Sequence, residues 1–187
     1  MNDIIKKKIN IAHIGIHNKA NLNSGDTLLF NVVRDLFDFF YPEQINWELI
    51  QIWEEFTLDQ VLNINNNFDG IVLGGGGLLM KDQKGSDVKN SGWQWNCSSE
   101  VMNKINIPLI IFAIGYGRFR GQEDFDPIFY ESIQTMNLKS EFFSLRNNGS
   151  IEQVKKYLKR NNDDHYSLKR QFCPTTIISK IYEDKKL

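Results

Sequence analysis

Four consecutive glycines, Gly74, Gly75, Gly76 and Gly77, follow the apolar residues 70–73. An apolar run of this kind, bounded by glycine, predicts a buried strand of a parallel sheet. Glycine accepts positive φ and lets a ligand approach the main chain closely. Because open α/β sheets bind ligands where their strands end, we interpret the four glycines as one wall of a substrate-binding crevice. A turn without a ligand is the alternative interpretation.

Arg146 is the basic side chain best placed to meet an anionic ligand. It directly follows residues 142–145, which predict a short strand, and it precedes Asn147 and Asn148, which turn the chain into a helix. Its planar guanidinium matches the geometry of a carboxylate or a phosphate. A salt bridge within the protein is an equally good interpretation on local grounds.

A second pair of glycines, Gly115 and Gly117, follows the strongly apolar residues 107–114. The carboxyl ends of parallel strands share one edge of the sheet, so we expect these glycines to line the same substrate-binding site. Arg118 and Arg120 stand next to them and are further candidate anion contacts. Solvent exposure is the favoured interpretation for both arginines.

The loop after the first predicted strand, residues 17–26, brings Asn23, Gly25 and Asp26 to the same edge. Backbone N–H groups at the start of the helix that follows can bind an anion. The carboxylate of Asp26 would repel a phosphate placed against it. We therefore expect Asp26 to cap the helix or to hold a sugar hydroxyl.

Two common nucleotide-binding motifs do not fit this spacing. The dinucleotide fingerprint needs G-x-G-x-x-G between the first strand and the first helix, where this chain has only Gly15 and Gly25. A phosphate-binding P-loop needs Lys and Ser or Thr after its last glycine, where this chain has Leu78 and Leu79.

The sequence contains no arrangement typical of nucleophilic or metal chemistry. It has no G-x-S-x-G, and His13, His17 and His165 lack the spacing of shared metal ligands. His13 is predicted to pack inside the first strand, and a position of His17 in the crevice is the less favoured alternative. Cys97 and Cys173 fit neither a metal pattern nor a disulfide framework. We expect no metal, no cofactor and a reducing compartment.

Composition places the chain among soluble globular proteins with one core. It has 187 residues, of which 41% are hydrophobic and 24% charged, and a formal net charge of −1. Such a balanced charge does not favour nucleic-acid binding. No apolar run is long enough to span a bilayer, and the N-terminus lacks a signal-peptide core.

Periodicity predicts strands that alternate with helices. Strands are expected at residues 8–16, 45–53, 70–73, 107–114 and 142–145, and helices at residues 24–41, 57–62, 98–105, 127–136 and 150–160. This alternation is typical of an α/β fold: a Rossmann-like parallel sheet with helices on both faces.

Four segments, in this order, resemble the polysaccharide pyruvyl transferase family. They are Asn-Ser-Gly-Asp at 23–26, the glycine segment at 70–79, Ala-Ile-Gly-Tyr-Gly at 113–117 and Ser-Leu-Arg-Asn-Asn-Gly-Ser at 144–150. The chain departs from the family pattern at Ile114, where Gln is frequent, and at Asn147, where an acidic residue is common.

The resemblance implies two Rossmann-like halves, as in GT-B glycosyltransferases, with this chain forming the N-terminal half over residues 9–182 and tails at 1–8 and 183–187. It implies transfer of a pyruvyl group from phosphoenolpyruvate to a sugar of a surface glycan or its precursor. Arg146 matches the arginine of the family's S-x-R motif, so the resemblance assigns donor binding to it. A cytoplasmic location, including the periphery of a membrane, is expected.

The resemblance implies that the family's second half supplies a histidine and further basic residues. The sequence ends at residue 187, soon after residues 173–176, which lie about where that half should begin. We therefore expect a second domain or subunit to complete the site. Two alternatives stay open: a non-catalytic or partner-dependent half-domain, and a glycosyltransferase-like domain that uses a sugar nucleotide.

Overall fold

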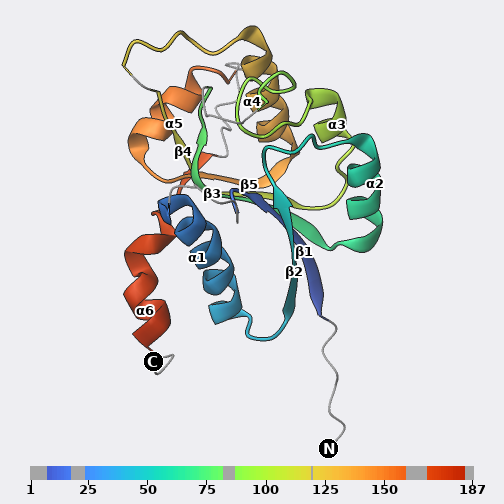
Figure 1. Cartoon of the computed structure of the whole chain (residues 1–187), viewed down its shortest axis with the longest axis vertical. Coiled ribbons are helices and arrows are strands. Elements are labelled where there is room, and N and C mark those ends of the chain that lie inside the picture. The colour runs from blue at the N-terminus through green and yellow to red at the C-terminus, as the bar shows by residue number, and fades with distance from the viewer. Residues whose placement is uncertain (1–7, 18–23, 82–86, 119, 159–167, 184–187) are drawn as a thin grey trace, which may run out of the picture.

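A computed structural model describes residues 8–17, 24–81, 87–118, 120–158 and 168–183. They build one parallel six-stranded sheet in the order β2-β1-β3-β4-β5-β6 (Figure 1). The strands are β1 (Ile9–Gly15), β2 (Ile45–Gln51), β3 (Gly70–Leu79), β4 (Leu109–Tyr116), β5 (Ser140–Leu145) and β6 (Leu168–Arg170).

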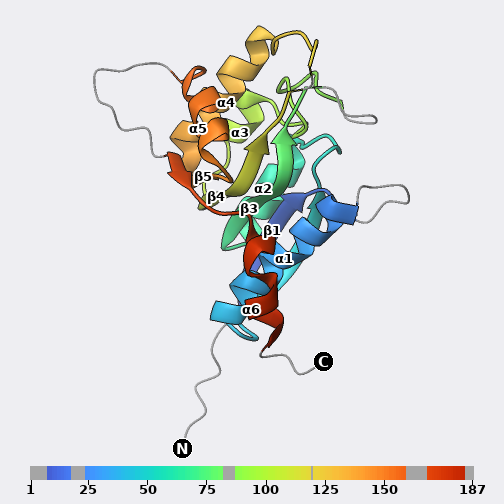
Figure 2. The same ribbon diagram turned by 90° about the vertical axis from the view of Figure 1, so that its left-hand side faces the viewer.

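Helices connect the strands and cover both faces of the sheet, so the Rossmann-like α/β prediction is confirmed. The helices are α1 (Ser24–Phe40), α2 (Leu58–Asn67), α3 (Ser99–Asn103), α4 (Pro127–Lys139), α5 (Asn148–Lys155), the 3-10 helix η1 (Pro174–Ile177) and α6 (Ile178–Glu183). α6 lies alongside α1 on one face (Figure 2). Helices α2 to α5 pack on the other face.

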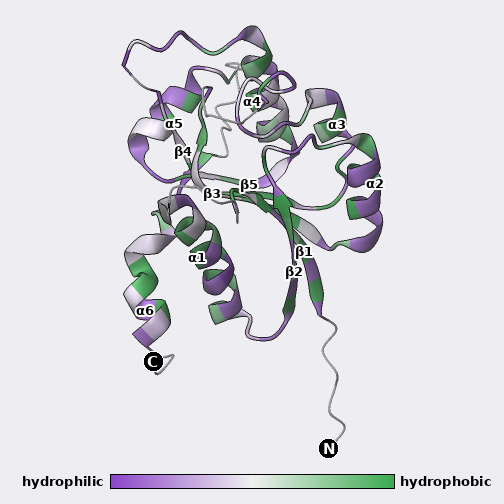
Figure 3. Ribbon diagram, in the orientation of Figure 1, coloured by the Kyte–Doolittle hydropathy of each residue, from purple (hydrophilic) through white to green (hydrophobic). Residues whose placement is uncertain are grey.

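Each face of the sheet has its own apolar core. Hydrophobic residues, coloured green, are prominent along the central strands, whereas the helices mix hydrophobic and polar residues along their length (Figure 3). On the α1 face, Val33 and Leu36 of α1 and Ile181 of α6 pack on Val72 and Phe112. The opposite core is larger and includes the fully buried side chains of Trp93 and Trp95.

Local signals account for the helix starts. Thr57 caps α2 through a reciprocal pair of hydrogen bonds with Gln60, as predicted for a helix beginning there. Pro127 occupies the first turn of α4. The side chain of Asn147 accepts a hydrogen bond from the Ser150 N–H and caps α5. Helix α2 continues to Asn67, five residues beyond the predicted end at 62.

The predicted end of the third strand at residue 73, before the four glycines, is wrong. They lie inside β3, which continues through them to Leu79. Gly74 has a φ of +150°, and a Cβ at this position would collide with the Phe112 carbonyl of β4. Glycine is therefore required here because the neighbouring backbone occupies the space of a side chain.

Two other elements differ from the prediction. Strand β6 has no counterpart among the predicted strands because its three residues, Leu168, Lys169 and Arg170, lack an apolar pattern. Residues 87–97 are irregular, and residues 91–97 within them are buried: Ser91 and Gln94 are 0% exposed. This loop is held by specific hydrogen bonds, one of them from the Trp93 indole to Ser132 Oγ at 2.8 Å.

Candidate functional site

The direction in which strands are added to the sheet reverses between β1 and β3. From β1 the chain adds β2 on one side, and then it adds β3, β4, β5 and β6 on the other side. In open α/β sheets, the carboxyl edge at such a reversal is the usual ligand-binding crevice. Helix α1 begins at this edge, and the glycine-rich part of β3 runs beside it. The fold therefore assembles several of the predicted site residues here.

Arg146 reaches this edge from the end of β5. Its backbone N–H donates to the Ile114 carbonyl at 3.0 Å, which ties it to β4. A Cβ built on Gly115 would lie 2.6 Å from the Arg146 Cζ and 2.8 Å from an Nη, and one on Gly77 would lie 3.4 Å from that Nη. The guanidinium therefore lies flat on the main chain of β4 and extends to β3, where only glycine leaves room for it.

No hydrogen bond or ion pair ties the Arg146 guanidinium to any part of the chain that the structure describes. The residue is half-buried, so water solvates its charge only in part. A partly desolvated guanidinium with unused N–H donors is well suited to receive a carboxylate or a phosphate.

Asp26 lies on the opposite side of the same space, in the first turn of α1. Its Oδ1 would be 3.6 Å from a Cβ on Gly76. Burial raises the pKa of the Asp26 carboxyl, and the positive charge of Arg146 opposes that rise. The charges of Asp26 and Arg146 thus interact electrostatically across the glycines. The expected capping role of Asp26 is wrong, because α1 already begins at Ser24 and Asp26 lies within the helix.

The four glycines of β3 divide into two pairs with different surroundings. Gly74 and Gly75 pack inward: Gly74 meets β4, and a Cβ on Gly75 would lie 3.2 Å from Val33 of α1. Gly76 and Gly77 adjoin Asp26 and Arg146, respectively. The second pair therefore forms the floor of the candidate site, and the first pair holds that floor in place.

His13 supports this floor from below. Its ring is fully buried and stacks on Phe30 with 3.9 Å between ring centroids. Nε2 lies 2.5 Å from the Gly74 carbonyl oxygen, which can only accept, so Nε2 carries the proton. Burial lowers the pKa of His13 to about 3, and the ring is neutral at pH 7. The sequence interpretation of His13 as a packed histidine is confirmed.

The remaining predicted site residues lie at varying distances from this centre. Gly117 closes the end of β4, with its N–H donating to the Leu79 carbonyl at 3.0 Å, and a Cβ there would lie 3.1 Å from Met80. Gly25 is exposed in the first turn of α1. Asn23 falls outside the described residues. His17 follows β1, and its ring stacks on Phe30 with 5.2 Å between ring centroids.

Gln94 is a neighbour of the site that sequence reasoning missed. Its side-chain amide donates to the Gly77 carbonyl at 3.4 Å and accepts from the Trp53 indole at 3.4 Å. A fully buried glutamine in an irregular segment gives no periodic signal. Trp93 and Trp95 are as buried as it is, and a Trp-Gln-Trp triplet in a polar stretch is the one cue that the sequence contained.

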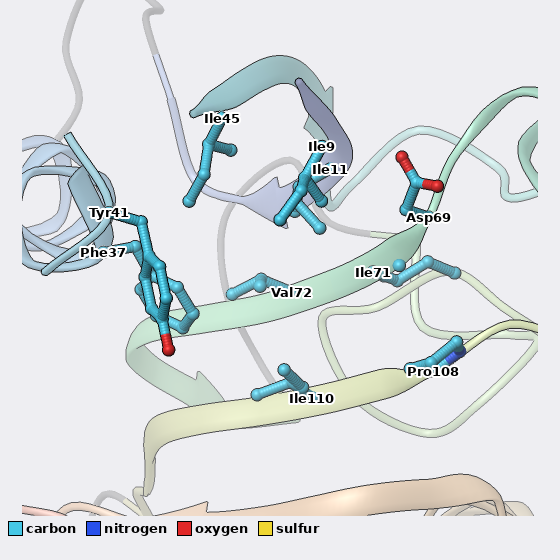
Figure 4. A pocket seen from close by; sticks show the side chains of 11 residues that line it. Ile9, Ile11, Phe37, Tyr41, Ile45, Asp69, Ile71, Val72, Pro108 and Ile110 are labelled. Atoms are coloured by element: carbon cyan, nitrogen blue, oxygen red, sulfur yellow. The ribbon is translucent and has the colours of Figure 1, made fainter. Parts of the chain in front are cut away.

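A groove of about 260 Å³ opens at the opposite, amino-terminal edge of the sheet (Figure 4). Isoleucines at the starts of β1, β2, β3 and β4 line it together with Phe37 and Tyr41 of α1, and Asp69 contributes a carboxylate. This apolar lining, with a negative charge at its rim, does not suit an anionic ligand. The glycine floor at the carboxyl edge is the better candidate.

Within the described residues, no three His, Cys, Asp or Glu side chains are grouped to hold a metal ion. None of the helices in the described ranges is both long and apolar enough to cross a membrane.

The family model described as Polysaccharide pyruvyl transferase matches residues 23–187. This range contains Asp26, all the glycines of the floor and Arg146. No curated protein matches the sequence.

Proposed function

This chain belongs to the polysaccharide pyruvyl transferase family, and we propose that its carboxyl-edge site binds phosphoenolpyruvate as the donor of a pyruvyl group for a sugar. One observation carries the proposal: a half-buried arginine lies on a glycine floor without a partner in the described chain. Phosphoenolpyruvate carries a phosphate and a carboxylate on neighbouring atoms, and a guanidinium fork pairs with either group in bidentate fashion.

The reaction needs a proton acceptor as well as an anion clamp. One sugar hydroxyl adds to C2 of the enol ester while C3 takes up a proton. A second hydroxyl then displaces phosphate from C2 and closes a cyclic ketal. Two hydroxyl protons are released, one proton is gained at C3, and phosphate leaves with the other. We propose Asp26 as the group that accepts the first hydroxyl proton, because its raised pKa brings it closer to the working pH.

The second sugar hydroxyl and the departing phosphate need groups beyond Asp26 and Arg146. We propose that a further domain or a partner subunit supplies them across the carboxyl edge. The proposed division of labour gives donor binding to this chain and part of the acid–base chemistry to its partner. A half-domain that binds without catalysis remains the alternative.

Calorimetric titration with phosphoenolpyruvate tests the proposal. Arg146→Met removes the charge and keeps most of the side-chain volume, and Arg118→Met is the matched control at the end of the adjacent strand. We expect Arg146→Met to weaken binding by about 10- to 100-fold, the usual effect of losing hydrogen bonds to a charged group. The control should bind as the wild type does.

Equal affinities for the two variants would contradict the proposed site. A sugar nucleotide that raises the melting temperature when phosphoenolpyruvate does not would favour the glycosyltransferase-like alternative. Donor binding without turnover, even with the rest of the family architecture supplied, would favour the non-catalytic half-domain.

A further inference from the structure

Strands β4 and β5 change their register just before the candidate site. Ile111 pairs with Phe143, and the next pair is Ile114 with Leu145. Three steps along β4 therefore match two steps along β5, which is the definition of a β-bulge. Ala113 takes up the extra residue with a φ of +51°, a left-handed conformation that alanine rarely adopts.

Ser144 fills this bulge with its hydroxyl. Oγ accepts a hydrogen bond from the Ala113 N–H at 2.9 Å and donates one to the Ile111 carbonyl at 3.0 Å. The side chain is 0% exposed, so no water can replace these bonds. The serine thus satisfies two backbone groups of β4 beside the point where the ladder with β5 shifts.

The bulge decides which way the end of β4 faces. Ile111 and Ile114 both point into the core beneath α2 to α5, whereas Phe112 and Ala113 both belong to the core beneath α1 and α6. Regular alternation would instead turn Ile114 toward α1 and Gly115 away from it. Because of the extra residue, Gly115 faces the guanidinium of Arg146.

We propose that Ser144 is a positioning residue of the anion site: its hydroxyl holds the bulge that places Gly115 beneath the Arg146 guanidinium. Ser144 touches no ligand in this proposal, and it acts through the backbone of β4. The identity of the ligand rests on the proposed function, whereas the role of Ser144 in the bulge does not.

Ser144→Ala is compared with Ser132→Ala, which removes another fully buried serine hydroxyl, the acceptor of the Trp93 indole hydrogen bond. Both variants should lose stability, but only Ser144→Ala should weaken phosphoenolpyruvate binding, by about tenfold. Ser144→Thr keeps the hydroxyl and should recover part of the affinity. In an Arg146→Met background, Ser144→Ala should have no further effect, since the two residues act through one contact.

Additive effects in that cycle, or equal affinity losses for the two serine variants, would overturn the proposal. Should Ser144→Ala fail to fold, Ser144→Cys takes its place, because its slightly larger thiol fills the space and weakens both hydrogen bonds. The results that support or overturn the proposal are the same for Ser144→Cys as for Ser144→Ala.

A measurement without ligand separates this proposal from the proposed function. Amide hydrogen exchange at Ala113 should quicken in Ser144→Ala, and a crystal structure of the variant should show Gly115 moved from beneath Arg146. If the wild type does not bind phosphoenolpyruvate, the proposed function fails and these two observations alone decide the role of Ser144. Unchanged exchange and an unmoved Gly115 would overturn it.

Discussion

Arg118 and Arg146 follow neighbouring strands at the same edge of the sheet, yet their surroundings differ completely. Arg118 donates to Asp124 Oδ1 and to the Gln122 carbonyl, both at 2.5 Å. Arg146 lies on glycine main chain and has no partner among the described residues. The positive charge of Arg118 is neutralised by the chain itself, whereas the guanidinium of Arg146 has no hydrogen bond or ion pair with the described residues.

The carboxylates of the two regions differ in the same way. The side chain of Asp124 is 81% exposed and its pairing with Arg118 is a surface salt bridge. Asp26 is less exposed, and burial raises its pKa despite the nearby Arg146. The comparison teaches that a charged pair with poor neutralisation at a partly desolvated position is a candidate for function, whereas a close pair in solvent is typical of the protein surface.

After the loss of Arg146 itself, the largest effect is expected from filling the space that Gly115 leaves beneath its guanidinium. Gly115→Ala would place a methyl group within 2.8 Å of the Arg146 guanidinium and force the side chain away from β3. Phosphoenolpyruvate affinity should fall by about tenfold or more, measured by calorimetric titration.

Gly149→Ala is the control for that variant. The nearest atom to a Cβ on Gly149 is Asn147 Oδ1 at 3.5 Å, and the residue lies in α5. This substitution should leave affinity unchanged and stabilise the protein by up to about 1 kcal/mol. Retained affinity in Gly115→Ala would show that the flat contact with Arg146 is not needed for binding.

A smaller effect, with opposite signs for stability and activity, is expected from Asp26→Asn. The folded protein raises the pKa of this carboxyl, so the folded state binds protons more tightly than the unfolded chain. The ionised carboxyl therefore costs stability as pH rises above the ordinary aspartate pKa. Asparagine removes that cost, and we expect a melting temperature about 1–2 °C above wild type at pH 7.

Thermal unfolding of Asp26→Asn between pH 3 and pH 7 checks this sign. The difference from wild type should vanish near pH 3, where the aspartate is protonated in both states. Transferase activity with a completed site should fall at all pH values. If Asp26→Asn instead unfolds at a lower temperature than wild type at pH 7, and this deficit disappears at pH 3, Arg146 holds Asp26 as a structural ion pair.

The smallest effect is expected from the Arg118 region. Asp124→Asn should change the free energy of unfolding by less than about 1 kcal/mol, as is usual for exposed pairs, and this change should shrink further at high salt. Phosphoenolpyruvate affinity should stay within twofold of wild type. A large loss of affinity would transfer the anion site from the end of β5 to the end of β4 and remove the contrast between the two arginines.

Much of the site could be predicted from the sequence because strand ends leave local signals. The apolar residues 142–145 lead directly into Arg146, and glycine follows or interrupts the neighbouring strands, so a shared anion-binding edge was a reasonable expectation. The extent of β3 was not predictable in the same way. Four consecutive glycines predict the end of a strand. Only the close approach of the Phe112 carbonyl from β4 explains why β3 needs glycine at residue 74.

Ser144 belongs to the S-x-R motif of the resemblance, but its role in the bulge escaped prediction, as did the role of Gln94, for a different reason. Their hydrogen-bond partners lie 31 and 33 residues away for Ser144, and 17 and 41 residues away for Gln94. A polar residue in a strand or a loop carries no mark of such distant pairing. Its role becomes visible only when the sheet register and the packed loop are known.

The sequence by itself determined the alternation of strands and helices, the edge at which glycines and Arg146 meet, and the family, because these depend on periodicity and on short motifs. The tertiary structure decided which arginine is neutralised, which two of the four glycines form the floor, and on which face Gly115 lies. Those properties depend on contacts between strands that are distant in the chain, and a shift of register by one residue would reverse them.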